Sequence, residues 1–129
     1  MTPELTVLAL AAILQALQIG LAAVVMNSDV GAQWNAGPRD HQPDFSPMTG
    51  RLRRAVNNHF ESLAFFTVAA LVTSVSGQGT ALTAWASWIY LGARILYVPA
   101  YALGWTPWRS VIWGVGFVAT MIIIVAALF

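Results

Sequence analysis

The sequence predicts an all-α integral membrane protein in which four transmembrane helices form one bundle. The first observation is composition: 58% of the 129 residues are hydrophobic and only 9% are charged, whereas soluble domains carry about 25% charged residues. The second is a mean hydropathy of +0.69. The third is the presence of four apolar stretches, each long enough to cross a hydrocarbon core of about 30 Å. We expect a single domain over residues 1–129, with spans at about 5–26, 52–76, 82–102 and 110–129.

The charged and reactive residues exclude several classes of function. The net charge is +1, all six basic residues are arginines, and cysteine is absent. So few basic residues, placed near helix ends, do not indicate nucleic-acid binding. Without cysteine the chain has no disulfide, no thiolate nucleophile and no thiolate metal ligand. Any thiol chemistry therefore needs a thiol from a bound ligand.

The first span, 5–26, contains no charge. It lacks a basic start and a small-residue cleavage site, so we interpret it as a membrane helix and not as a signal peptide. Gln15 and Gln18 are expected to form hydrogen bonds inside the bundle, and ligand binding by them is the alternative.

Residues 27–50 are predicted to form the one sizeable loop, because they are polar and include three prolines. His41 lies near Asp40 and Asp44. One histidine in a proline-rich loop is too little for a metal site, so we expect a solvated loop and no metal.

The second span begins with polar residues. At about 100° per residue, Arg54, Asn58 and Glu61 fall within an arc of about 60°. Ionisable groups are expensive inside a membrane, so they indicate a functional site, with a structural ion pair or a solvated helix end as alternatives. The third span repeats the pattern, because Arg94 and two tyrosines cluster in a similar arc. Pro99 is expected to kink that helix or end its regular hydrogen bonding.

The arginines also predict the orientation. The loop 27–50 and the loop before Arg109 carry the basic side chains at the ends of the spans, so the positive-inside rule makes both loops cytoplasmic and both termini non-cytoplasmic. One polar cleft near the cytoplasmic end is then expected, and its arginines favour an anionic ligand. The residues predicted to line it are Arg54, Asn58, Glu61, Arg94, Tyr97, Tyr101 and Arg109.

These patterns resemble the membrane-associated proteins in eicosanoid and glutathione metabolism, the MAPEG family. The second span has Arg54-x3-Asn58-x2-Glu61, and the third has Arg94-x2-Tyr97-x3-Tyr101. Arg109 and Ser110 then open the fourth span, and the likeness covers essentially the whole chain. The form of the segment 96–101 is similar to the bacterial branch of the family, which places the protein in a bacterial inner membrane.

The resemblance implies a homotrimer of four-helix protomers that binds glutathione between neighbouring subunits. It implies that Arg54, Asn58 and Glu61 hold the charged ends and amides of the tripeptide. Arg94 and Tyr97 complete the predicted binding set. The predicted catalytic set lies beside the sulfur and consists of Arg109, Ser110 and Tyr101.

The chemistry of these side chains agrees with such a site. A free thiol has a pKa of about 8.5, and a nearby guanidinium favours the thiolate, which is the nucleophile. We therefore expect a transferase or peroxidase that attacks a hydrophobic electrophile or a lipid hydroperoxide. Glu61 would bind the ligand ammonium, and Arg94 is expected to pair with a carboxylate such as Glu61 inside the bundle.

Two other classes of function stay open. A non-catalytic relative would bind a lipid or a partner with the same fold. A small proton-coupled exporter would need a carboxylate deep inside a span, but Glu61 lies only two turns from its predicted helix start.

Overall fold

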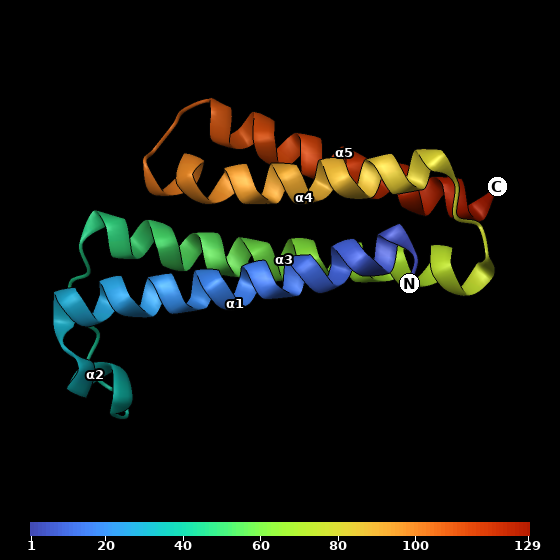
Figure 1. The fold of residues 1–129 in the computed structure, drawn as a ribbon. Helices are drawn as coiled ribbons and strands as arrows, with labels where there is room; N and C mark the ends of the chain where they lie inside the picture. The colour runs from blue at the N-terminus through green and yellow to red at the C-terminus, as the bar shows by residue number, and fades with distance from the viewer.

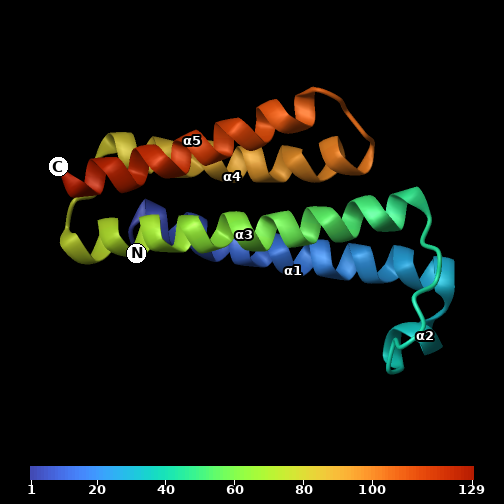
Figure 2. The ribbon, with the colours of Figure 1, turned by 180° about the vertical axis from the view of Figure 1, so that it is seen from behind.

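The computed structural model describes residues 1–129 as an all-helical chain of five helices. Four long helices lie side by side in antiparallel order, and both termini lie at the same end (Figure 1). The opposite end carries the two loops and the short helix α2, which projects beside the bundle, as the reverse view also shows (Figure 2). The helices are α1 (Pro3–Val30), α2 (Ala32–Ala36), α3 (Pro47–Ser76), α4 (Ala81–Ala102) and α5 (Trp108–Leu128).

Local sequence signals explain most of the helix ends. The side chain of Thr2 accepts a hydrogen bond from the backbone N–H of Leu5 at the start of α1. Ser46 does the same for Thr49 at the start of α3. Such hydroxyl caps, each followed here by a proline at the first helical position, satisfy backbone donors that have no partner inside the helix. At the end of α3, Gly77 adopts φ 71°, a left-handed conformation that glycine tolerates at no steric cost.

The predicted loop at 27–50 is shorter and more ordered than expected. Helix α1 continues to Val30, α2 follows, and α3 begins at Pro47. The carboxylate of Asp29 accepts a hydrogen bond from the backbone N–H of Ser46 at 2.9 Å and another from the Thr49 hydroxyl. These bonds join the end of α1 to the start of α3, which explains why the helices extend into the polar segment.

The third predicted span forms a helix with nearly the predicted bounds. Pro99 does not end it, because α4 continues to Ala102 and the Leu103 N–H still donates to the Pro99 carbonyl at 2.9 Å. By length and composition, three helices are apolar enough to cross a membrane: α1, α3 and α5. Helix α4 has 22 residues, but its arginine, tryptophans and tyrosines lower its hydropathy. A fourth membrane crossing therefore stays a prediction.

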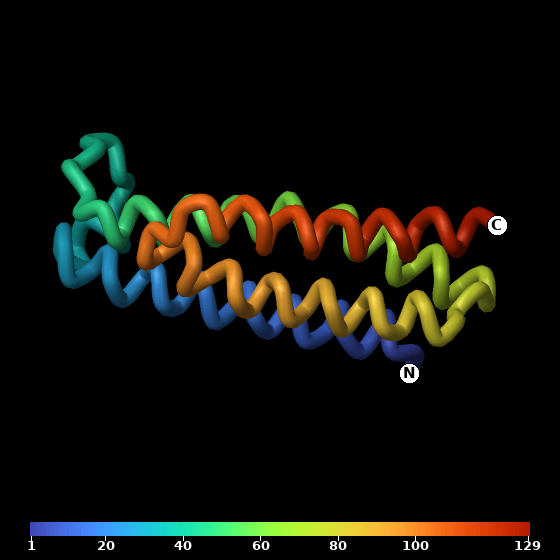
Figure 3. Tube along the Cα trace, turned by 90° about the horizontal axis from the view of Figure 1, so that it is seen from above, coloured from blue at the N-terminus to red at the C-terminus, as the bar shows by residue number.

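The main hydrophobic core lies towards the end that carries the termini. Phe66 of α3 stacks on Tyr90 of α4 with ring centres 4.1 Å apart, and Ile123 of α5 is fully buried in the same cluster. Alanines such as Ala11 and Ala69 complete this cluster and let the helices approach closely. Seen from above, α5 lies over α3 and α4 lies over α1 (Figure 3), and both pairs are in contact.

The two glutamines of α1 have different outcomes. Gln15 donates through Nε2 to the Val56 carbonyl of α3 at 3.2 Å, so the predicted hydrogen bond within the bundle is confirmed. Gln18 is equally buried, but neither of its polar atoms has a partner within the chain. The prediction was therefore wrong for Gln18 at the level of one protomer.

Candidate functional site

Tyr101 contacts two arginines that come from different helices. Arg54 of α3 donates through Nε to the Tyr101 hydroxyl at 2.9 Å. The guanidinium carbon of Arg109, at the start of α5, lies 4.7 Å from the centre of the Tyr101 ring, and that of Arg54 lies 5.7 Å away. Tyr97 packs edge-on against the same ring with centres 5.6 Å apart. Three helices thus bring four of the predicted residues together.

A small polar cleft of about 170 Å³ opens beside this cluster. It offers an amide, a phenol, a guanidinium, a hydroxyl and an indole, which belong to Asn58, Tyr97, Arg109, Ser110 and Trp113. Four of these five residues were predicted from the sequence. Trp113 was not, although its position one helical turn after Arg109 and Ser110 places it on the same side of α5.

A second cleft, of about 100 Å³, lies next to the first one. Glu61 and Ser62 line it, and it shares Asn58 and Trp113 with the first cleft. Asn58 therefore borders both spaces. The exposed carboxylate of Glu61 is the single acidic group among the lining residues.

Arg94 does not pair with a carboxylate, which corrects the sequence-based expectation. It is 2% exposed, and it donates through Nε to His59 Nδ1 at 3.1 Å and through Nη1 to Asn58 Oδ1 at 3.0 Å. Glu61 is two residues beyond His59, which turns its side chain by about 200° around α3. The side chain of Glu61 therefore faces the second cleft, while that of His59 faces Arg94.

His59 is the polar residue that sequence reasoning missed. It is fully buried, and its Nε2 lies 3.0 Å from the Ala11 carbonyl of α1. The carbonyl can only accept a hydrogen bond and the Arg94 N–H can only donate one. His59 therefore carries its proton on Nε2, accepts with Nδ1, and is neutral.

The electrostatics of the cleft favour an anion. The partner of Arg54 is a phenol, and Arg109 lies against a ring face, so neither guanidinium is neutralised by a carboxylate of the same chain. Two other arginines have structural contacts: Arg51 donates to the Ala102 carbonyl at 3.3 Å, and Arg53 packs 4.5 Å from the centre of the Phe45 ring. Arg109 lines the cleft, and Arg54 reaches the same Tyr101 side chain, so these are the two arginines with a charge left for an anion there.

A comparison with known families places the chain. The model of the MAPEG family matches residues 7–129, which is nearly the whole length. The chain belongs to the MAPEG family. A search of curated proteins found no match. Membership confirms the family that the motifs resemble, and this family includes glutathione transferases and peroxidases.

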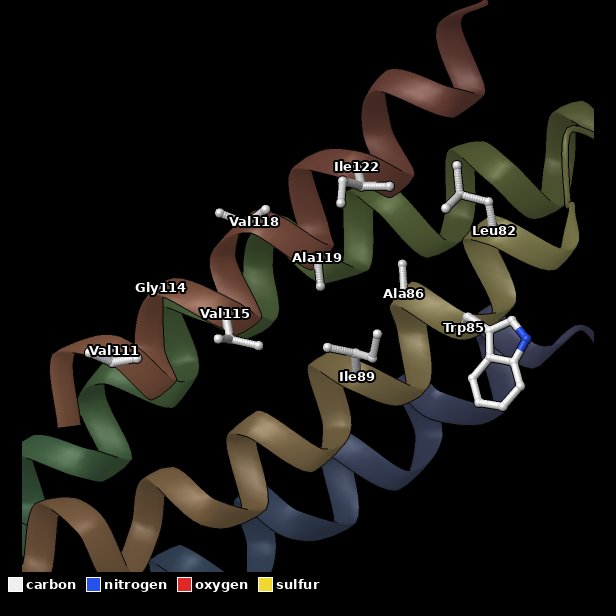
Figure 4. A pocket seen from close by; sticks show the side chains of 10 residues that line it. All are labelled: Leu82, Trp85, Ala86, Ile89, Val111, Gly114, Val115, Val118, Ala119 and Ile122. Carbon is white, nitrogen blue, oxygen red and sulfur yellow. The ribbon is translucent and has the colours of Figure 1, made fainter. Parts of the chain in front are cut away.

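A large apolar groove of this MAPEG protein lies between α4 and α5, with a volume of about 510 Å³. Figure 4 shows its lining, in which Val115 and Ala119 of α5 point towards Ile89 and Ala86 of α4. Nine of the ten lining residues are hydrophobic, so the groove offers no group for acid–base chemistry or for binding an anion. It suits hydrocarbon, and the candidate for chemistry is the polar cleft at Arg109.

Proposed function

We propose that this MAPEG protein is a glutathione-dependent membrane transferase or peroxidase. The observation that carries the proposal is that Arg109 lines a polar cleft while it and Arg54 both contact Tyr101, and neither arginine has a carboxylate partner. Such cations suit a ligand that has carboxylates and a thiol that must ionise. Arginine stays protonated in a partly apolar site, which lysine does less reliably.

In the proposed reaction Arg109 stabilises the thiolate of bound glutathione. The thiol proton leaves to solvent, and the sulfur lone pair then forms a bond to an electrophilic carbon of a hydrophobic substrate. Either a leaving group departs from that carbon with its bonding electrons, or an activated double bond opens and the resulting carbanion takes a proton from solvent. For a lipid hydroperoxide, two glutathione thiols are oxidised to one disulfide while the O–O bond breaks to give an alcohol and water. The hydroxyls of Ser110 and Tyr101 would donate hydrogen bonds to the sulfur or to the oxygen that gains negative charge.

The rest of the tripeptide would bind along α3. Arg54 is proposed to bind a ligand carboxylate, Asn58 an amide oxygen, and Glu61 the ammonium group. The polar cleft has a volume of about 170 Å³. This is less than the volume of pockets that bury a drug-sized ligand, which is about 300–1,000 Å³. A second copy would complete the site, which supports the homotrimer with shared glutathione sites that the family resemblance implies.

The membrane placement is part of the same proposal. All four long helices would cross the membrane, with the arginine-rich end in the cytoplasm and both termini outside. The host would be a bacterium, with the protein in its inner membrane. Glutathione would then enter from the cytoplasm, while an apolar substrate would approach through the bilayer.

The test is the ultraviolet absorbance of bound thiolate near neutral pH, with affinity measured in parallel by calorimetry. Arg109→Ala should retain most of the glutathione affinity but lose most of the thiolate signal, and its turnover should partly recover at alkaline pH. Arg109→Lys should restore only part of the signal, because a point charge does not replace the planar guanidinium. Full thiolate absorbance and full turnover in Arg109→Ala would refute the mechanism. Tight binding without any thiolate in the wild type would instead favour a non-catalytic, ligand-binding role.

A further inference from the structure

A chain of three hydrogen bonds runs across three helices behind the cleft. The Ala11 carbonyl of α1 accepts from His59 Nε2 at 3.0 Å, and His59 Nδ1 accepts from Arg94 Nε at 3.1 Å. Arg94 Nη1 then donates to Asn58 Oδ1 at 3.0 Å. His59 and Arg94 are both at least 98% buried, so water cannot replace these partners. The chain ends on the residue that borders both polar clefts.

The hydrogen bond from Arg94 fixes the orientation of the Asn58 side-chain amide. The guanidinium can only donate, so it selects the oxygen of the Asn58 amide and excludes the nitrogen. The Asn58 Nδ2 group then keeps both of its N–H donors, with no partner of its own among the hydrogen bonds of the chain. Because Asn58 lines both clefts, these donors are available to an acceptor on a bound molecule.

We propose that His59 is a positioning residue of the cleft, which acts through Arg94 to present the Asn58 amide donors to a carbonyl or carboxylate oxygen of the ligand. The inference rests on the proposed function in that it takes glutathione as this ligand. His59 suits the position because one neutral imidazole both accepts from Arg94 and donates to α1. A leucine of similar size would do neither and would leave the guanidinium free to turn.

The test is a double-mutant cycle with glutathione affinity, measured by calorimetry in detergent, as the readout. His59→Leu should weaken binding about fivefold, the typical value of one hydrogen bond, whereas His59→Gln should bind nearly as the wild type because its amide both donates and accepts. In an Asn58→Ala background, His59→Leu should cause almost no further loss of glutathione affinity, because His59 acts on the ligand only through the Asn58 amide. The thiolate absorbance of the bound thiol should stay normal in His59→Leu, since Arg109 is not part of the chain of hydrogen bonds.

A matched control separates positioning from general stability. Gln15→Leu also removes a hydrogen bond between α1 and α3, the one from the buried Gln15 to the Val56 carbonyl, but Gln15 makes no hydrogen bond to Asn58, His59 or Arg94. It should lower the melting temperature to a similar degree as His59→Leu without changing glutathione affinity. Equal losses of affinity in Gln15→Leu and His59→Leu, or additive effects of His59→Leu and Asn58→Ala, would overturn the positioning role.

A readout without glutathione keeps this inference distinct from the proposed function. The side-chain amide of Asn58, labelled with ¹⁵N, should give one ordered NMR signal in the wild type and in His59→Gln. The signal should broaden or shift in His59→Leu. If wild-type protein binds no glutathione but shows this pattern, the proposed function fails and the positioning of Asn58 stands. An Asn58 signal that does not respond to His59→Leu refutes the positioning.

Discussion

Replacing Arg94 by methionine should destabilise the protein by about 1–3 kcal/mol. Arg94→Met keeps a long, flexible side chain but removes the donors to His59 Nδ1 and Asn58 Oδ1. His59 Nδ1 is a buried acceptor, and leaving it without a donor costs about 1–3 kcal/mol. The hydrogen bond to Asn58 Oδ1 is only part-buried, so its loss costs about 0.5–1.5 kcal/mol. Part of this cost is offset, because the Arg94 Nη2 group is itself buried without a partner in the chain, and methionine removes that desolvation penalty.

The assay is equilibrium unfolding in detergent followed by circular dichroism, with His59→Leu and the double variant measured beside Arg94→Met. Removing both members of a buried polar pair is cheaper than removing one, so the double variant should be more stable than the sum of the single losses predicts. Wild-type stability of Arg94→Met would refute the reasoning, since it would mean that the two acceptors find other donors. Strict additivity of the two single losses would refute the contact itself.

Three further outcomes are expected. Glu61→Gln should weaken glutathione binding by about 1.5–3 kcal/mol in calorimetry, and unchanged affinity would remove Glu61 from the binding set. Reporter fusions at Gly77 and after Phe129 should read as non-cytoplasmic and one near Gln42 as cytoplasmic; a cytoplasmic C-terminus would place the cleft on the other side of the membrane. Native mass spectrometry in mild detergent should give a homotrimer, and a stable monomer would contradict the shared site.

The helical class and the clustering of polar residues could be predicted from the sequence because both depend on simple periodicities. Apolar stretches of sufficient length predicted the long helices, and a rotation of about 100° per residue placed Asn58 and Glu61 on one side of α3. The contacts between helices could not be obtained in this way. That Arg54 meets the Tyr101 hydroxyl depends on how α3 and α4 pack, which the pattern within one helix does not determine.

The partner of Arg94 was predicted wrongly, because charge alone does not determine which side of α3 faces Arg94. Glu61 is the acidic residue nearest to Arg94 in the sequence, but its side chain faces the second cleft. The sequence does contain a pattern that indicates a buried His59. Leu52, Ala55, His59 and Phe66 follow helical spacing on the buried side of α3, and a histidine in such an apolar row must find polar partners. Arg94 was the available donor.

The order of residues along α3 follows the cost of burying polar groups. Phe66 itself packs in the main core, against the Tyr90 ring. About two turns closer to the arginine-rich end, His59 and Asn58 are polar and bind Arg94. Another turn on, Arg54 is exposed. Polar groups become cheaper as they approach the interface, so Arg54 can stay exposed, whereas the buried His59 needs Arg94 as a partner. Beyond this layer the Phe66–Tyr90 stack joins α3 to α4 in the main core.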